Sequence, residues 1–210
     1  MSALRVRILA YDGVEALDFA GPFEVFTTAS RVSQRMQPGT TAPFEVASVA
    51  HAPNGQPVQA RAGLRLLADH AVTGHPMADV LIVPGGVVDV PMASSETLRW
   101  IADCAAGAQV VASVCTGVFL LAKSGAVTQE AVTTHWEDIA DLREQFLQLD
   151  VREGVRWVDT GRIVSSAGIS AGIDMSLHLV ERLAGRALAE RTARQMDYAW
   201  THDSSSTPSA

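Results

Sequence analysis

Cys115, one of the two cysteines in the chain, stands where a strand-like run is followed by a helical one. The segment SVCTGVFLLA at 113–122 reads as an apolar strand, then the cysteine, then Thr116, Gly117 and a helical run. A nucleophile on such a tight strand-to-helix turn is lifted out of the sheet and lies beside the free N–H groups of the helix. We therefore predict a reactive thiol whose pKa is lowered. The alternative is a buried cysteine at the end of a strand.

A cysteine nucleophile needs a proton partner, and histidine is the usual one. His135 ends the run TTHW at 133–136 and forms a His-x-Glu pair with Glu137. An equally good interpretation is a structural or pocket-wall histidine that caps the following helix, with Trp136 beside it in the pocket. The six histidines are scattered without the spacing of metal ligands, which argues against a metal centre.

Asp18 is a second candidate for proton transfer. It stands in VEALDFAGPFEVF between Leu17 and Phe19, shortly before a Gly-Pro pair. A carboxyl group among apolar side chains tends to stay protonated, so it can act as a general acid or donate to a thiolate. Because proline is favoured in the first turn of a helix, a helix that begins near Pro22 would make Asp18 its N-cap. The sequence leaves both interpretations open.

Two glycine-bearing loops offer backbone N–H groups. The loop Pro84-Gly85-Gly86 directly follows the apolar run DVLIV, so it lies at the carboxyl edge of the predicted sheet, where open α/β sheets place their sites. The second loop, GISAG at 168–172, follows a predicted hairpin and precedes a helix. Either could be only a tight turn. Neither continues as a phosphate-binding motif, so neither is expected to cradle a phosphate.

The elements that must position these residues alternate between strands and helices. Four β-branched or apolar runs predict strands, and the two central runs lack alternation, as in strands covered by helices on both faces. A fifth strand is predicted at 132–136, and a hairpin is predicted at 155–168. The four strands are 4–10, 44–50, 79–86 and 109–114, and the helices are 22–30, 94–106, 116–123, 137–147 and 171–184. This order predicts an α/β fold with a mostly parallel sheet.

Composition bounds the class of protein. The chain has 210 residues, of which 48% are hydrophobic and 19% charged, as in one soluble globular domain. The net charge of −7 argues against a nucleic-acid partner. No run approaches the roughly 20 apolar residues of a membrane span, and the first residues predict a cytoplasmic protein without a membrane partner. We assign residues 1–200 to the domain and 201–210 to a flexible tail, and we expect Cys104 on a buried helix face.

Four segments together resemble one known family. They are VEALDFAGPFEVF, LIVPGG, SVCTGVFLLAKSGAV with TTHW, and SSAGISAGIDMSLHLVERLAG. In this combination they are similar to the ThiJ/PfpI superfamily, with its class I glutamine amidotransferase-like fold, and within it to isocyanide hydratases and to the sensor domains of some AraC-type regulators. The resemblance runs from Leu4 to about Tyr198. It implies a flavodoxin-like three-layer sandwich with a cysteine nucleophile elbow, commonly as a homodimer.

The resemblance also implies roles for individual residues. Cys115 corresponds to the nucleophile of the elbow, and Asp18 to the acid that faces its sulfur. Thr116 stands where the superfamily's proteases carry a histidine, so a Cys-His dyad is not expected there. His135 is too close to Cys115 in sequence to be the histidine of a glutamine amidotransferase. The backbone groups that would form the oxyanion hole or contact the thiolate or substrate are those of Gly86, Thr116, Gly168 and Ile169.

These residues suit the hydration of a small-molecule isocyanide without a cofactor. By hypothesis, the Cys115 thiolate attacks the terminal carbon while protonated Asp18 delivers a proton, and water then converts the thioimidate to an N-substituted formamide. One alternative is another cysteine enzyme of the superfamily that acts on a reactive carbonyl or an imine-like intermediate. A different class of alternative is a non-catalytic ligand sensor related to the AraC-type regulators.

Overall fold

The chain builds a parallel sheet from the strand runs that its sequence predicts. A computed structural model describes residues 2–51, 55–74 and 76–204. In that part of the chain a seven-stranded sheet has the order β10-β11-β7-β6-β1-β2-β5, and only β10 and β11 pair in antiparallel fashion. The strands are β1 Leu4–Ala10, β2 Phe44–Ala50, β5 His70–Ala71, β6 Val80–Val83, β7 Val110–Val114, β10 Trp157–Asp159 and β11 Ile163–Ser166. The predicted α/β fold, the four strand runs and the hairpin are confirmed.

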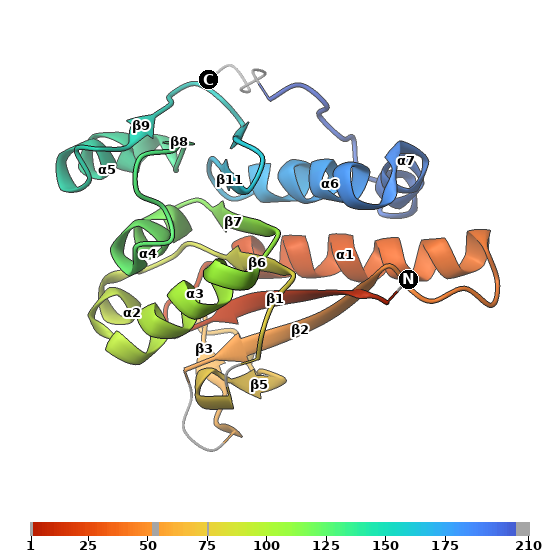
Figure 1. The fold of residues 1–210 in the computed structure, drawn as a ribbon, viewed down its shortest axis with the longest axis horizontal. Coiled ribbons are helices and arrows are strands. Elements are labelled where there is room, and N and C mark those ends of the chain that lie inside the picture. The colour runs from red at the N-terminus through yellow and green to blue at the C-terminus, as the bar shows by residue number, and fades with distance from the viewer. Residues whose placement is uncertain (1, 52–54, 75, 205–210) are drawn as a thin grey trace.

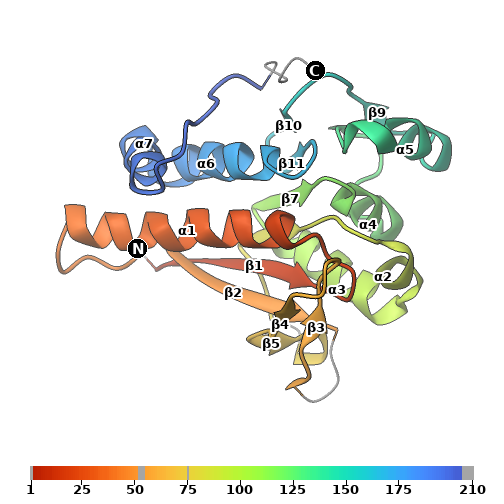
Figure 2. The same ribbon diagram turned by 180° about the vertical axis from the view of Figure 1, so that it is seen from behind.

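Helices cover both faces of this sheet (Figures 1 and 2). One group packs together on one face, and a second group packs on the other. The first comprises α1 Ala16–Met36, α6 Ala171–Ala184 and α7 Arg186–Gln195, and the second α2 Asp89–Ala93, α3 Ser95–Gly107 and α4 Gly117–Ser124. Two helical layers explain why the central strands are apolar throughout. Among the described residues, no helix combines the length and the apolar character that a membrane crossing requires.

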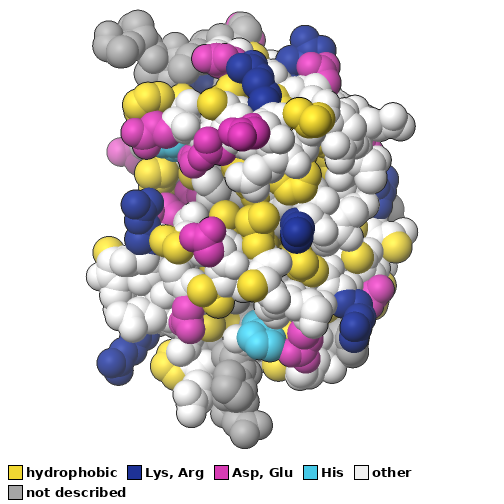
Figure 3. Space-filling model, turned by 90° about the vertical axis from the view of Figure 1, so that its left-hand side faces the viewer, with side chains coloured by type: hydrophobic (Ala, Val, Ile, Leu, Met, Phe, Trp, Pro, Cys, Tyr) yellow, Lys and Arg dark blue, Asp and Glu magenta, His cyan; other side chains and the backbone are white. Residues whose placement is uncertain are grey.

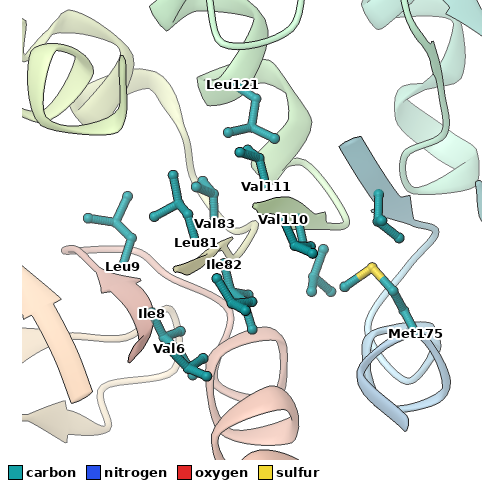
Figure 4. Packing of buried hydrophobic residues seen from close by; sticks show 14 of the residues in the cluster. Val6, Ile8, Leu9, Leu81, Ile82, Val83, Val110, Val111, Leu121 and Met175 are labelled. Carbon is teal, nitrogen blue, oxygen red and sulfur yellow. The ribbon is translucent and has the colours of Figure 1, made fainter. Parts of the chain in front are cut away.

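The core lies around β6 and β7, which are buried along their whole length. Figure 4 shows Val111 of β7 beneath Leu121 of α4, whereas Met175 of α6 packs from the opposite side. Both strands end at the same edge of the sheet because they run parallel. The loops that follow them, at Pro84 and Cys115, are therefore anchored on fully buried strands.

The first helix begins earlier than predicted, which changes the interpretation of Asp18. Helix α1 starts at Ala16 with Glu15 as its N-cap, and Pro22 lies inside it. The helix tolerates Pro22 in its second turn but loses one hydrogen bond there. An N–H at this position would have donated to the carbonyl of Asp18. The prediction of a helix that starts near Pro22 with Asp18 as its N-cap is therefore wrong. Asp18 lies within the first turn instead.

The predicted fifth strand is also wrong. Only Ala131–Val132 form a strand, β8, which pairs with β9 (Asp150–Val151) in a separate small sheet. The β-branched residues that follow bond to other groups: the Thr133 N–H donates to Ser165 Oγ, and Thr134 Oγ1 donates to the carbonyl of Cys115. A short 3₁₀ helix, Trp136–Asp138, and α5, Ile139–Gln145, then complete the segment.

The first residues of the predicted flexible tail form hydrogen bonds with the domain. The Thr201 N–H donates to Asp174 Oδ1 at 2.9 Å, and the carbonyl of Ser204 accepts from the Arg156 N–H at 2.6 Å. These contacts tie residues 201–204 to α6 and to the segment before β10. Residues 205–210 of the predicted tail lie outside the described residues.

Candidate active site

Cys115 occupies the turn between β7 and α4 with its backbone in the left-handed region, at φ 55°. Its N–H donates to the carbonyl of Ser166 at 3.1 Å, which ties the turn to β11. A Cβ at Gly117 would overlap the carbonyl oxygen of Val83, so only glycine lets α4 begin this close to β6. A strained cysteine held between a strand and a helix has the backbone geometry that a nucleophile elbow requires. That Cys115 reacts stays a prediction.

The sulfur of Cys115 is nearly enclosed, since the residue is only 8% exposed. The backbone N–H groups of Thr116 and Ile169 and the Asp18 carboxyl group lie close enough to the thiol to shift its pKa, and the thiol in turn affects the pKa of Asp18. Burial, with a further contribution from Asp18, raises the pKa of the thiol to about 12, although the two N–H groups oppose this. The lowered pKa predicted from the sequence is therefore wrong. The position at a helix N-terminus predicts a favourable dipole, which would lower the pKa. It does not reveal the burial of the thiol, which raises the pKa.

Asp18 has no exposed surface and an incomplete set of hydrogen bonds. Its Oδ2 accepts the Gly85 N–H at 3.1 Å, whereas Oδ1 is buried and has no hydrogen-bond partner among the described residues. Burial raises the pKa of this carboxyl group to about 7, and the nearby Glu15 carboxylate adds to the rise. A buried acid with one unpaired oxygen is costly to a fold, so its place beside Sγ marks it as a candidate for chemistry.

The two groups together hold one proton over a wide pH range. The pKa of the carboxyl group is raised to about 7 and that of the thiol to about 12, so at mildly alkaline pH the proton rests on sulfur. Because the groups are adjacent, the proton can pass from one to the other inside the site. A carboxylate placed in this way can deprotonate a thiol as the sulfur attacks, and can then return the proton to a bound molecule.

The loop Pro84-Gly85-Gly86 is held against Asp18 by groups that the sequence did not reveal. Tyr11 Oη donates to the carbonyl of Pro84 at 3.0 Å, and the Glu15 N–H donates to the carbonyl of Gly85 at 2.8 Å. A Cβ on Gly85 would lie 2.9 Å from Asp18 Oδ2, so the glycine allows the close approach. The sequence indicated this loop as a source of N–H groups, but it gave no sign of Tyr11.

Gly86, which the sequence assigns to an oxyanion hole, has a partner in this structure. Its N–H donates to Thr116 Oγ1 at 2.9 Å, and the same hydroxyl group donates to the Gly86 carbonyl at 3.0 Å. The N–H groups that reach Sγ directly are those of Thr116 and Ile169. The role of Gly86 toward a substrate oxygen or nitrogen stays a prediction.

His135 takes its partners from its own segment. Its Nδ1 accepts the Glu137 N–H at 3.4 Å as the N-cap of the 3₁₀ helix and lies 3.4 Å from Asp138 Oδ2. Among the described contacts, no hydrogen bond joins His135 to Cys115. The interpretation of His135 as a capping residue is confirmed, and the exposed Glu137 is not brought to the sulfur.

His135 and Trp136 both line a cavity of about 400 Å³ beside the Cys115 turn, as do Gly168 and Ile169. The other cysteine, Cys104, lies in α3 away from this region, and its thiol donates to the carbonyl of Pro76 at 3.3 Å. Burial raises the pKa of Cys104 to about 11, and the predicted buried helix face is confirmed.

Comparisons with known proteins agree on one family. The model of the DJ-1/PfpI family matches residues 4–182. An isonitrile hydratase from Pseudomonas putida is 31% identical over 94% of this chain and 79% of its own length. The HTH-type transcriptional regulator GbdR of Pseudomonas aeruginosa is 30% identical over 69% of this chain, a match that covers 39% of the regulator.

A solved structure extends the similarity to the fold. The crystal structure of a ThiJ/PfpI family protein from Pseudomonas syringae superposes with a TM-score of 0.81 at 26% identity. The match covers 96% of this chain and 77% of that protein.

Proposed function

The chain belongs to the DJ-1/PfpI family, and we propose that it is a cysteine-dependent hydratase that converts an isocyanide to an N-substituted formamide. The observation that carries the proposal is the Cys115–Asp18 pair: a thiol beside a fully buried carboxyl group that has one free oxygen. The similarity to an isonitrile hydratase over nearly the whole chain supports the same reaction.

In the first step, sulfur adds to the terminal carbon of R–N≡C. Ionised Asp18 takes the proton of the Cys115 thiol as the S–C bond forms, and then gives this proton to the same carbon. The product is the thioimidate R–N=CH–S–Cys115. The N–H groups of Thr116 and Ile169 stabilise the negative charge that develops on sulfur during the proton transfer.

In the second step, water adds to the thioimidate carbon. Asp18 takes a proton from the water, the hydroxyl group bonds to carbon, and the proton passes to nitrogen to give R–NH–CH(OH)–S–Cys115. The C–S bond then breaks, and the hydroxyl proton returns to sulfur through Asp18. One molecule of water is consumed and R–NH–CHO is released, so neither a cofactor nor a metal is required.

The test is formamide formation from an aryl isocyanide by the purified protein. We expect turnover by the wild type and none by Cys115→Ala. Cys104→Ala is the matched control, because it removes the other cysteine, which lies buried in α3 away from Asp18. Full activity of Cys115→Ala, or equal loss in both variants, would refute the proposal.

A ligand sensor is the second candidate function. It is favoured by the similarity to the regulator GbdR, of which this chain matches only part. Absence of turnover with every isocyanide, together with rapid alkylation of Cys115, would favour the sensor over the hydratase. A homodimer stays a prediction from the family resemblance, and a cytoplasmic location stays a prediction from the first residues of the sequence.

A further inference from the structure

The cavity beside Cys115 has mostly apolar walls. Its volume is about 400 Å³, which is large enough for a ring-sized group. Large hydrophobic side chains are unusually exposed at its edge: Trp136 is 74% exposed and Ile169 is 39% exposed. Covering such side chains with an apolar ligand removes apolar surface from water, which favours binding.

The cavity adjoins the Cys115 turn through Ile169 and Thr134, whereas Cys115 itself is not one of its lining residues. Ile169 lines the cavity, and its backbone N–H is close enough to the Cys115 thiol to oppose the rise in the thiol's pKa. Thr134 also lines it, and its hydroxyl group donates to the carbonyl of Cys115 at 2.9 Å. An isocyanide is linear from its terminal carbon through nitrogen to the substituent. With the carbon on Sγ, the substituent extends away from sulfur, and the neighbouring cavity lined by Ile169 and Thr134 is large enough to receive it.

The wall that His135 and Gly168 form is tightly packed. The His135 ring packs against Gly168, where a Cβ would overlap Cδ2, and lies 5.6 Å from the Trp136 ring between centroids. The hydrogen bond from the Glu137 N–H fixes the His135 ring in turn. Trp136 lies beside this packed wall with its indole largely exposed, so the ring is available to cover a flat apolar group.

The charges around the cavity disfavour an anionic ligand. Arg156 is the one arginine among the described residues that line it, and its guanidinium group is bound to the buried Asp174. Glu153 also lines the cavity and forms an ion pair with Arg143, and Asp138 lies beside His135. Figure 3, which faces the edge of the sheet toward which β1 runs, shows hydrophobic side chains across the centre and acidic ones gathered in the upper half. A negatively charged substituent would therefore find no unpaired arginine among the described residues that line the cavity.

We propose that this cavity binds the substituent of the isocyanide, and that Trp136 makes the protein selective for neutral, bulky, apolar substituents, aromatic or cyclic. The predicted selectivity in turnover rests on the proposed hydratase function, whereas the predicted binding site does not. Trp136 is a specificity residue: it contacts the part of the substrate that does not react.

The experiment compares phenyl isocyanide, methyl isocyanide and isocyanoacetate with the wild type, Trp136→Ala and Leu147→Ala. Leu147 is the matched control, because it is 86% exposed and does not line the cavity. For the wild type we expect kcat/KM to fall in the order phenyl, methyl, isocyanoacetate. Trp136→Ala should lower kcat/KM for phenyl isocyanide about tenfold, mainly through KM, and leave methyl isocyanide unchanged. Equal effects of the two variants on phenyl isocyanide would overturn the proposal.

A binding measurement separates this inference from the proposed reaction. N-phenylformamide, titrated calorimetrically, should bind the wild type and Leu147→Ala alike and Trp136→Ala about tenfold more weakly. If no isocyanide is turned over but this pattern holds, the hydratase proposal fails and the cavity assignment stands. If isocyanides are hydrated but N-phenylformamide binds all three proteins equally, the cavity assignment fails and the hydratase stands.

Discussion

Asp18 and Asp174 occupy equivalent places in two helices but have very different surroundings. Asp18 lies in the first turn of α1, Asp174 lies in the first turn of α6, and neither has exposed surface. Oδ2 of Asp174 accepts hydrogen bonds from Arg156 and from Tyr198 Oη, and Oδ1 accepts the Thr201 N–H. Asp18 accepts one backbone N–H, and its other oxygen has no partner among the described residues.

The difference separates a structural carboxylate from one that is available for chemistry. Three donors compensate for the burial of Asp174, and they join α6 to the segments before β10 and after α7. Burial without such donors raises the pKa of Asp18 to about 7, where its proton can be exchanged under ordinary conditions. Burial alone would not have distinguished them. We therefore expect substitutions of Asp18 to change activity and substitutions of Asp174 to change stability.

The largest expected effect is on turnover. Asp18→Asn removes the group that moves protons in both steps, so kcat for formamide formation should fall by about 10²- to 10⁴-fold. Asp174→Asn should leave kcat unchanged for each folded molecule, with the folded fraction measured by circular dichroism. Similar losses of kcat in the two folded variants would remove the distinction between the two aspartates.

The second effect is on stability and concerns Asp174. Asp174→Ala leaves the buried Arg156 guanidinium without its carboxylate, so the free energy of unfolding should fall by about 3 to 5 kcal/mol. Urea denaturation measures this change. Glu153→Ala, which breaks an exposed ion pair with Arg143, is the control and should cost less than about 1 kcal/mol. A cost for Asp174→Ala no larger than the control would contradict its structural role.

The third effect is a gain in stability when Asp18 is replaced, and its size depends on pH. The pKa of Asp18 is raised from its ordinary value to about 7 on folding, so its contribution to stability is greatest below about pH 4 and is lost as the pH rises through about 7. Asp18→Asn should therefore raise the free energy of unfolding by about 1 to 3 kcal/mol at pH 8 and gain nothing near pH 4. Denaturation at the two pH values measures this difference. A variant that is destabilised at pH 8 would show that ionised Asp18 supports the fold.

The smallest effect tests a single donor to Asp174. Tyr198→Phe removes one hydrogen bond to a carboxylate that keeps its guanidinium partner, so the free energy of unfolding should fall by about 1 kcal/mol. Because Tyr198 bonds to Asp174 and not to Asp18, kcat should not change. A large loss of kcat in this variant, measured under saturating isocyanide, would show that the two aspartates are coupled.

The sequence predicted the elements whose signals are local. Strands β1 and β2 and helix α6 coincide with the predicted ranges, because β-branched runs and helical spacing act within a few residues. The fifth strand was wrong because Thr133 and Thr134 bond to Ser165 and to the Cys115 carbonyl, which are distant in sequence. Helix α1 was predicted to start too late because Pro22 was taken for a first-turn proline.

The candidate site was only partly predictable for the same reason. The turn at Cys115 and the apolar setting of Asp18 can be seen in short segments, but their contact joins residues nearly a hundred positions apart. The pKa of Cys115 depends on how much solvent the fold removes, which no local pattern reveals. Likewise, the hydrogen bond from Tyr11 Oη to the Pro84 carbonyl and the bond from the Gly85 N–H to Asp18 form only once β1 and β6 are paired.

The most direct test of the account is the pH dependence of kcat/KM for isocyanide hydration by the wild type. If ionised Asp18 takes the proton of the Cys115 thiol, kcat/KM should be constant above about pH 7 and fall about tenfold for each pH unit below it. A profile that stays flat from about pH 5 to about pH 8 would contradict the account. So would the same decline in Asp18→Asn, because the titrating group would then not be Asp18.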